Sequence, residues 1–362
     1  MDATRDGLEA RKRRWLAFLD MSLPPSHVFQ IAYPPDDLPR PQPWPDKKAE
    51  RIEWAWQTYQ RQMARAEWLR DDSLPYLDVY TGTEIFAEAF GCQVHRPEDN
   101  MPFAKPAIGD ARDVSRLKAP DLGSTPLAML FDIADELRRR AGPSALLKMI
   151  DIQSPMDIAA LIWDKNGFYV GIVDAPEAVR ELAAKVRGLL AAFLDEWFAR
   201  YGSEFIAHYP AYYMPRGITL SEDEVGAVSQ GMFEEFFLPE LVELSGRYGG
   251  FGMHCCANAR HQWDGFKKIP RLRLLNLVQP EDQLRAAYAF FAGHVAQMHS
   301  WCGAGPAWTW PEQYPQGARV VLQASAATRD EAIELSEKLC AACGRLPPSP
   351  GWRWPCPPGE HR

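Results

Sequence analysis

The chain alternates between two patterns of apolar residues. Short runs rich in β-branched or aromatic residues are each followed by a turn and then by a longer segment with apolar residues three or four positions apart. The first pattern is typical of buried strands and the second of amphipathic helices. The strand candidates are Leu77–Tyr80, Leu146–Ile150, Phe205–Ala207, Ile218–Leu220, Gly252–Cys256, Leu274–Val278, Val295–His299 and Val320–Gln323. The helix candidates are residues 84–90, 156–163, 176–200, 229–247, 258–268, 281–293 and 329–342.

Eight strand candidates that alternate with helices predict an α/β fold, a closed (β/α)₈ TIM barrel. An open, doubly wound sheet is the alternative. Such sheets commonly bind nucleotides, but no Gly-x-Gly-x-x-Gly follows a strand candidate and no Gly-x-x-x-x-Gly-Lys-Ser/Thr occurs in the chain. The pattern therefore favours the barrel and argues against nucleotide binding.

The two ends of the chain differ from this middle part in their proline content. Apolar residues at helical spacing predict helices over residues 1–20 and from Asp46, as N-cap, to about Leu69. Eight prolines between positions 24 and 45 argue against regular structure there, and six prolines with two tryptophans in 346–362 suggest a tail that docks on the surface. We expect an N-terminal helical, proline-rich extension over 1–74 that packs on the barrel, the barrel over 75–345, and the tail over 346–362.

Composition and charge narrow the class of protein. Hydrophobic residues make up 46% of the chain and charged residues 24%, which is the balance of a globular protein. The formal net charge of −8 argues against a nucleic-acid partner. No apolar run approaches the ~20 residues that cross a bilayer, and the first residues lack a signal-peptide pattern, so we expect a cytoplasmic protein with no membrane partner. The seven cysteines, an odd number, predict reduced thiols, some of them metal ligands.

The clearest chemical signal lies in the strand candidate Gly252–Cys256. Barrel enzymes carry their reacting groups at the carboxyl ends of strands. His254 and Cys256 are two positions apart, so both point to one face and Cys255 points to the other. An imidazole and a thiolate together suit zinc. On this spacing alone, a hydrogen-bonded core histidine and a cysteine that packs as a small apolar residue remain the alternative.

Two further pairs of residues offer sulfur donors. His299 and Cys302 follow a later strand candidate and could complete a tetrahedral site with the first pair. The alternative is a partly exposed histidine and a loop thiol. Cys340 and Cys343 close the last helix, away from any strand end, and we interpret them as packing thiols and not as a redox pair.

Acidic residues follow another strand candidate directly. Glu222, Asp223 and Glu224 lie where like charges and partial burial raise the pKa of at least one carboxyl, which would create a proton donor near neutral pH. These three are catalytic candidates. A helix start is the alternative, with Ser221 as N-cap and Glu224 as its capping-box partner, and both interpretations can hold together.

The segment Asp151–Asp157 also ends a strand and opens a helix. Ser154 is placed as its N-cap, with proline in the first turn. Asp151 is a further catalytic candidate at this strand end, and Gln153 and Asp157 are candidates for substrate binding.

Three of these segments together resemble one family. Met253–Asn258, the acidic turn that begins at Leu220 and continues through Ser229–Phe236 to Pro239, and Asp151–Asp157 are similar to the uroporphyrinogen decarboxylase superfamily, over about residues 75 to 342. The resemblance implies a (β/α)₈ barrel and one of two chemistries. One is the metal-free decarboxylation of haem biosynthesis. The other is zinc-dependent transfer of a methyl group between a corrinoid and a thiol such as coenzyme M.

The motifs favour the second branch of the superfamily. Decarboxylases carry an N-terminal motif with paired arginines, whereas the corresponding region here is Asp20–Pro25. Methyltransferases bind zinc through His-x-Cys, which His254 and Cys256 match, and through a cysteine after the last barrel strand, where this chain has Ser325. The resemblance then implies that Cys302 or His299 completes the site, that zinc binds weakly, or that the task has changed.

We therefore expect a zinc-dependent methyltransferase that moves a methyl group between a corrinoid or a methoxylated small molecule and a thiol-type acceptor. The corrinoid would be a visiting substrate, and a corrinoid protein is a candidate partner. The alternatives are a metal-free decarboxylase of a porphyrinogen-like polycarboxylate and a non-catalytic tetrapyrrole- or corrinoid-binding protein. We expect Asp151, His254, His299 and the acidic turn at one end of the barrel. Further substrate-binding candidates there are Asn258, Arg216 and Arg260, the latter two as the only arginines at the mouth.

Overall fold

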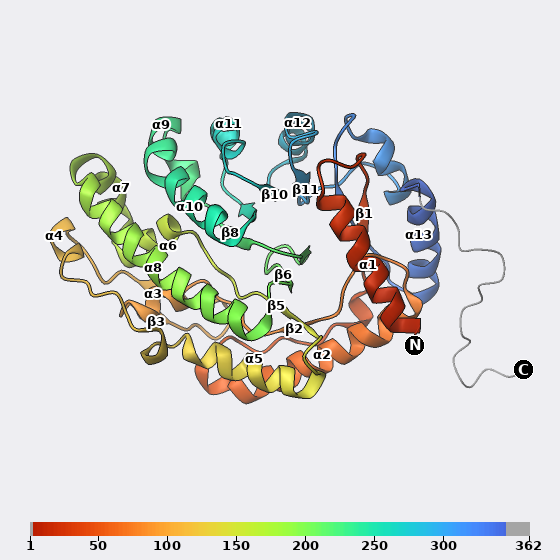
Figure 1. Cartoon of the computed structure of the whole chain (residues 1–362), viewed down its shortest axis with the longest axis horizontal. Coiled ribbons are helices and arrows are strands. Elements are labelled where there is room, and N and C mark those ends of the chain that lie inside the picture. Colours follow the sequence, from red (N-terminus) through yellow and green to blue (C-terminus); the bar gives the residue numbers. More distant parts are fainter. Residues whose placement is uncertain (1–2, 345–362) are drawn as a thin grey trace, which may run out of the picture.

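A ring of short strands lies inside a layer of helices (Figure 1). The computed structural model describes residues 3–344. The strands are β1 (Val28–Ala32), β2 (Tyr76–Asp78), β3 (Gln93–His95), β4 (Phe103–Lys105), β5 (Leu146–Lys148), β6 (Phe205–Ile206), β7 (Tyr213–Met214), β8 (Ile218–Ser221), β9 (Phe251–Cys255), β10 (Leu272–Leu277), β11 (Ala296–Gln297) and β12 (Val321–Ser325). The helices are α1 (Ala3–Leu19), α2 (Lys48–Trp68), α3 (Ile85–Ala89), α4 (Ala111–Val114), α5 (Ala128–Ala141), α6 (Pro155–Ile162), α7 (Lys165–Asp174), α8 (Pro176–Tyr201), α9 (Gln230–Met232), α10 (Leu238–Tyr248), α11 (Trp263–Phe266), α12 (Glu281–Phe290) and α13 (Arg329–Ala342).

The ring of strands closes on itself. Strands β8, β9, β10 and β11 are parallel neighbours in that order, as are β2 with β5 and β1 with β12. Two isolated parallel bridges continue the ring. Gln153–Ser221 joins the chain after β5 to β8, and Gln297–Val320 joins β11 to the residue before β12. The backbone N–H of Asp72 donates to the carbonyl of Phe29 at 2.8 Å and ties the chain entering β2 to β1. The described strands thus form the predicted (β/α)₈ barrel.

The proline-rich stretch near the N-terminus contains a barrel strand that the sequence did not predict. Strand β1 lies between Pro25 and Pro34, and its five residues pair in parallel with β12. The expectation that prolines exclude regular structure here is wrong, because a proline interrupts the ladder only at the position that it occupies. The predicted N-terminal extension is therefore joined to the barrel through strand pairing.

The predicted strand at Phe205–Ala207 exists, but it is not a member of the ring. Strand β6 pairs with β5 through one residue pair and with β7 in antiparallel order. The two strands form a hairpin between β5 and β8, and β1 takes the place in the ring that the sequence assigned to β6. The sequence also did not predict α5, α7 or the antiparallel pair β3–β4. Asp46 does not cap α2, whose N-cap residue is Lys47 without a side-chain bond.

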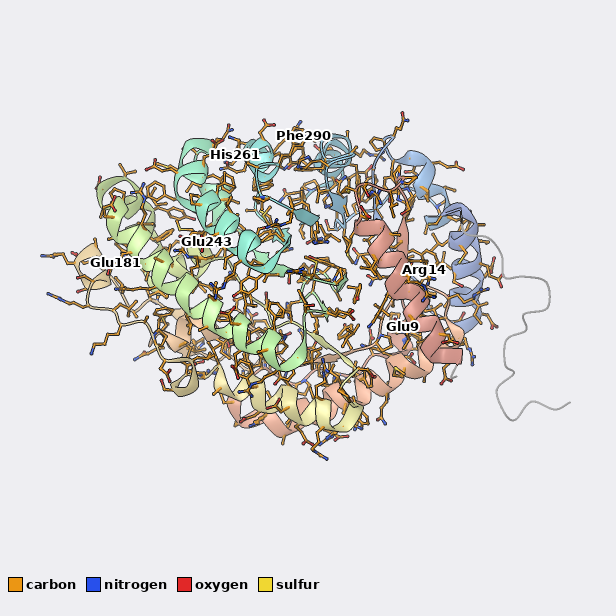
Figure 2. All side chains as sticks on the ribbon, in the orientation of Figure 1. Glu9, Arg14, Glu181, Glu243, His261 and Phe290 are labelled. Atoms are coloured by element: carbon orange, nitrogen blue, oxygen red, sulfur yellow. The ribbon has the colours of Figure 1, made fainter. Side chains whose placement is uncertain are left out.

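Two arginines hold helix α1 against the barrel. Figure 2 shows Arg14 on α1, and its Nε donates to Asp72 Oδ1 at 2.6 Å. Arg11 is 6% exposed and donates to the carbonyls of Ser73 and Leu69, both at 2.6 Å. These charge-assisted bonds hold the helix beside the chain that enters β2.

Apolar side chains fill the space inside the ring and between the ring and its helices (Figure 2). Leu147, Met253 and Leu275 on three ring strands are each at most 2% exposed. Within the described residues, no helix combines the length and the apolar character that a bilayer span requires. The tail predicted over 346–362 lies outside the described part of the chain.

Candidate metal centre

Three potential metal ligands converge at the carboxyl ends of β8 and β9. Asp223 follows β8, His254 lies within β9 and Cys256 follows β9, and one ligand atom of each lies within 4.8 Å of the others. His254 and Cys256 converge as the alternation of the strand predicts. Cys255 lies on the opposite face, is fully buried, and its thiol donates to the carbonyl of Ala257 at 3.8 Å.

The orientation of His254 is set by the neighbouring strand. In the β9–β10 register, His254 lies opposite Asn276, and His254 Nδ1 is 2.5 Å from Asn276 Oδ1. Asn276 Nδ2 donates to the carbonyl of Met298, so the amide oxygen faces the imidazole. This network assigns the proton to Nδ1 and leaves the lone pair of Nε2 free. A histidine held in this way is the usual form of a metal ligand.

Asp223 and Cys256 are linked by a short hydrogen bond. The backbone N–H of Cys256 donates to Asp223 Oδ1 at 2.6 Å. Burial, and then the negative charge of Asp223, raise the pKa of the Cys256 thiol to about 12. The thiol is therefore protonated at neutral pH unless a cation stabilises the thiolate, which is what a metal ion does.

The acidic turn is held by Asp157, which lies on α6. Asp157 is 1% exposed, and its carboxylate accepts from the backbone N–H groups of Asp223 at 2.8 Å and Glu224 at 3.0 Å. Ser154 caps α6 as predicted and accepts from the N–H of Asp157 at 3.0 Å. The capping box predicted for the acidic turn is not formed, since the short helix after it has Asp223 as N-cap residue and no side-chain cap bond.

The remaining two acids of the turn have different surroundings. Glu222 is fully buried, and burial, followed by the charge of Asp157, raises its pKa well above the usual range. Asp157 and Glu222 are neighbouring buried carboxyl groups, and repulsion disfavours two charges there. Because Asp157 accepts two backbone N–H bonds as a carboxylate, we assign the one proton of this pair to Glu222. Glu224 turns towards α7, where it pairs with Lys165 at 2.7 Å and accepts from the hydroxyl of Tyr169. The structure does not bring Glu224 to the metal ligands.

A histidine that the sequence did not single out accompanies Asp151. Asp151 follows β5, and its Oδ2 lies 3.3 Å from His208 Nδ1, while His208 Nε2 is 2.9 Å from Thr81 Oγ1. Burial alone would raise the pKa of Asp151, but His208, together with His254 and Lys148, outweighs burial and the pKa is lowered. His208 follows the strand candidate Phe205–Ala207, so the strand-end rule that selected Asp151 could have selected it as well.

Asp151, His208 and His254 line one small cavity at the barrel mouth. Its other lining residues are Ile152, Tyr209, Tyr212, Thr219, Leu220, Ser221 and Gly252. The ring of Tyr209 stands edge-on to His254, with 4.8 Å between ring centroids, and Tyr209 is 56% exposed. None of these lining residues is Arg or Lys, but Arg40 Nη1 donates at 3.2 Å to Thr81 Oγ1, the partner of His208.

His299 and Cys302 do not approach the three ligands. His299 is fully buried; its Nδ1 accepts from the N–H of Leu277 at 3.0 Å and its Nε2 lies 3.0 Å from Gln297 Oε1. Both ring nitrogens are thus engaged, and burial lowers the pKa of His299 to about 3. Cys302 is 6% exposed and accepts from the N–H of Gln323 at 3.4 Å. The expectation that one of them completes the site is wrong, because both lie in a separate packed region.

The substrate-binding candidates are scattered. Gln153 bridges to Ser221 beside the site, and its side-chain Oε1 is buried without a hydrogen-bond partner among the described residues. Asn258 and Arg260 are exposed after β9, and Arg260 lies over the Trp263 ring at 5.6 Å. Arg216 precedes β8 and is therefore at the opposite end of the barrel, so its expected place at the mouth is wrong.

The fold and this arrangement define a class of protein: a (β/α)₈ barrel with a candidate metal centre at the carboxyl ends of its strands. The sequence pattern of uroporphyrinogen decarboxylase (URO-D) matches residues 78–277, and the chain belongs to this family. A solved structure, a methyltransferase from Methanosarcina mazei, is similar with a TM-score of 0.62 and 13% identity, over 92% of this chain and 98% of that one. No curated protein sequence matches.

Proposed function

We propose that this chain is a zinc-dependent methyltransferase that transfers a methyl group to a thiol. The observation that carries the proposal is the convergence of Asp223, His254 and Cys256 at the end of the barrel where this fold carries its active sites. The family membership and the similarity in fold to a methyltransferase support it.

The three side chains fit zinc. Nitrogen, sulfur and carboxylate oxygen are the donors that zinc takes in proteins, and catalytic zinc sites use three protein ligands and leave the fourth position open. In this proposal Asp223 supplies the third ligand, in place of the cysteine that the family's methyltransferases carry where this chain has Ser325. Asn276 and Asp157 would support the ligands from behind, as outer partners of metal sites commonly do.

The residues around the site have distinct tasks in this mechanism. Zinc supplies Lewis acidity, which keeps a bound acceptor thiol in its nucleophilic thiolate form at neutral pH. Asn276 keeps the Nε2 lone pair of His254 directed at the metal. Asp151, which lies 3.3 Å from His208 at the mouth, is the carboxylate that would relay the proton of the thiol to solvent. The methyl donor is a corrinoid, brought by a carrier protein, or a methoxylated small molecule.

The adjacent cysteines give a matched test. Cys256→Ala removes a ligand, whereas Cys255→Ala removes a buried thiol one position away that faces the other side of the strand. With methylcobalamin and 2-mercaptoethanesulfonate as probe substrates, Cys256→Ala should abolish methyl transfer and lower zinc content, and Cys255→Ala should retain both. Equal losses in the two variants, or full transfer by Cys256→Ala, would contradict the proposal.

A further inference from the structure

A second binding region lies at the end of the barrel opposite the metal centre. A groove of about 580 Å³ runs between the end of α1 with its following turn and the residues that enter β10. Arg271 precedes β10 and Arg273 is its second residue, so the groove opens where this strand begins. The metal centre lies where β8 and β9 end. Ligands of the two regions would therefore not compete for space.

Three arginines gather at this groove. Arg271 and Arg273 line it, and Arg216 lies nearby. The pKa of Arg273 is lowered, mainly by burial and then by the positive charges of Arg216 and Arg271. No ion pair links any of the three to a carboxylate within residues 3–344, and Arg273 Nε is buried without a hydrogen-bond partner there. Like charges held together without an ion-pair partner are unfavourable, and an anion bound directly to them would relieve this repulsion.

Backbone carbonyls use only part of the donor capacity of these side chains. Arg271 Nη2 donates to the carbonyls of Ser245 at 3.3 Å and Gly246 at 3.4 Å, and Arg273 Nη2 donates to the carbonyl of Gly249 at 3.1 Å. A guanidinium carries five N–H donors, so donors remain on each. The groove also holds one carboxylate, Asp20, which accepts from the backbone N–H and the hydroxyl of Ser22 and forms no ion pair with the three arginines within the described residues.

The turn between α10 and β9 makes room for this cluster. A Cβ atom on Gly250 would lie 2.3 Å from Arg273 Nε, and one on Gly249 would lie 3.0 Å from Arg216 Nε. Gly249 also has a φ of +82°, which disfavours other residues. Two successive glycines thus let the side chains of Arg216 and Arg273 lie directly against the backbone of one turn.

The opposite wall of the groove is apolar and open to solvent. Leu16 is 47% exposed, Met21 36% and Leu23 44%, and all three line the groove. Large apolar side chains left open beside unpaired guanidiniums match a ligand with an anionic head and an apolar body. The volume of the groove is in the range of small-molecule sites.

We propose that this groove binds a small amphiphilic anion, with its carboxylate or phosphate head at Arg216, Arg271 and Arg273 and its apolar body along Leu16, Met21 and Leu23. The head would form charge-assisted, bidentate bonds that a lysine cluster would not reproduce. The inference is independent of the chemistry at the metal centre.

Dodecyl phosphate, kept below its micelle concentration, is a suitable probe for isothermal titration of the full chain. It should bind with a 1:1 stoichiometry. Dodecanol, which has the alkyl chain without the anionic head, and inorganic phosphate, which has the head without the chain, should each bind at least tenfold more weakly. Arg216→Gln, at an exposed position, and Arg273→Gln should each lower the affinity, and the double variant should lower it at least tenfold. Arg116→Gln, on the surface elsewhere, is the matched control and should change nothing.

Several results would overturn the proposal. Equal binding of dodecanol would indicate a general apolar surface, and equal binding of inorganic phosphate would indicate a simple anion patch. Unchanged affinity in the double variant, with circular dichroism showing an intact fold, would place the ligand elsewhere. Binding only to vesicles of anionic phospholipid would identify a membrane-facing surface instead of a small-molecule site.

Discussion

Replacing Asn276 by leucine tests how the protein prepares His254 to bind a metal. Asn276 is 3% exposed and connects two buried groups, because its Oδ1 receives the Nδ1 proton of His254 and its Nδ2 donates to the carbonyl of Met298. Leucine has a similar size but neither function. In Asn276→Leu the imidazole loses the partner that fixes its tautomer and its orientation.

The expected magnitude follows from these two bonds. Loss of an outer partner of a histidine ligand weakens metal binding by about 10- to 100-fold, which corresponds to roughly 1.4–2.8 kcal/mol. The metal-free protein should also lose about 1–3 kcal/mol of its free energy of unfolding, since the carbonyl of Met298 stays buried without its donor.

Asn276→Asp separates the two effects. Its carboxylate still accepts from His254 Nδ1 but cannot donate to the carbonyl of Met298. Zinc affinity, measured by competition with a chromophoric chelator at constant pH, should therefore fall in the leucine variant and be retained in the aspartate variant. Urea unfolding of the metal-free proteins should show a loss of stability in both. A zinc affinity of Asn276→Leu within twofold of the unmodified protein would refute this reasoning.

Three further changes test the surroundings of the site and the fold. In Asp157→Asn, an amide N–H would face one of the two backbone N–H groups that now donate to the carboxylate. Zinc affinity should therefore fall about tenfold in the same competition assay. An unchanged affinity would show that Asp157 does not hold the acidic turn in place for metal binding. Gly252→Ala puts a Cβ 1.9 Å from the Tyr212 hydroxyl and should cost about 1–3 kcal/mol in urea unfolding, whereas a cost below ~0.5 kcal/mol would show that the strand adjusts freely. Asp78 is buried between two cations, Arg51 at 2.8 Å and Lys148 at 3.1 Å, so Arg51→Met, which leaves Lys148 in place, should cost about 1–3 kcal/mol of the free energy of unfolding at pH 7. Burial would raise the pKa of Asp78, but its cationic neighbours lower that pKa to about 2. The native protein should therefore lose this stabilisation as the pH falls from about 4 through 2. An unfolding midpoint that stays constant over that range would contradict the pairing.

The sequence predicted the features of this protein that depend on local pattern. Seven of the ring strands and the convergence of His254 and Cys256 follow from periodicity along single segments. The missed strand, β1, lies between prolines, so its apolar residues do not stand out from a proline-rich background. Its place in the ring is defined by β12, almost 300 positions further along the chain.

The parts of the site that the sequence did not predict depend on neighbouring strands and helices. Asn276 reaches His254 only through the β9–β10 register, and Asp223 becomes a candidate ligand because Asp157, on another helix, holds its turn. His299 is the opposite case, a predicted ligand whose ring nitrogens are both engaged away from the site. The strand-end rule selects chemistry-bearing residues, but it does not distinguish a residue at the mouth from one whose ring is enclosed by backbone and glutamine.

Anomalous diffraction at the zinc absorption edge, from crystals of protein purified without chelator, tests the central claim most directly. The account predicts one peak between Asp223, His254 and Cys256, with Zn–S near ~2.3 Å and Zn–N near ~2.0–2.1 Å. It also predicts that this peak is lost in crystals of Cys256→Ala and kept in those of Cys255→Ala. An absent peak in zinc-supplemented crystals, or a peak at His299 and Cys302, would contradict the proposed metal centre.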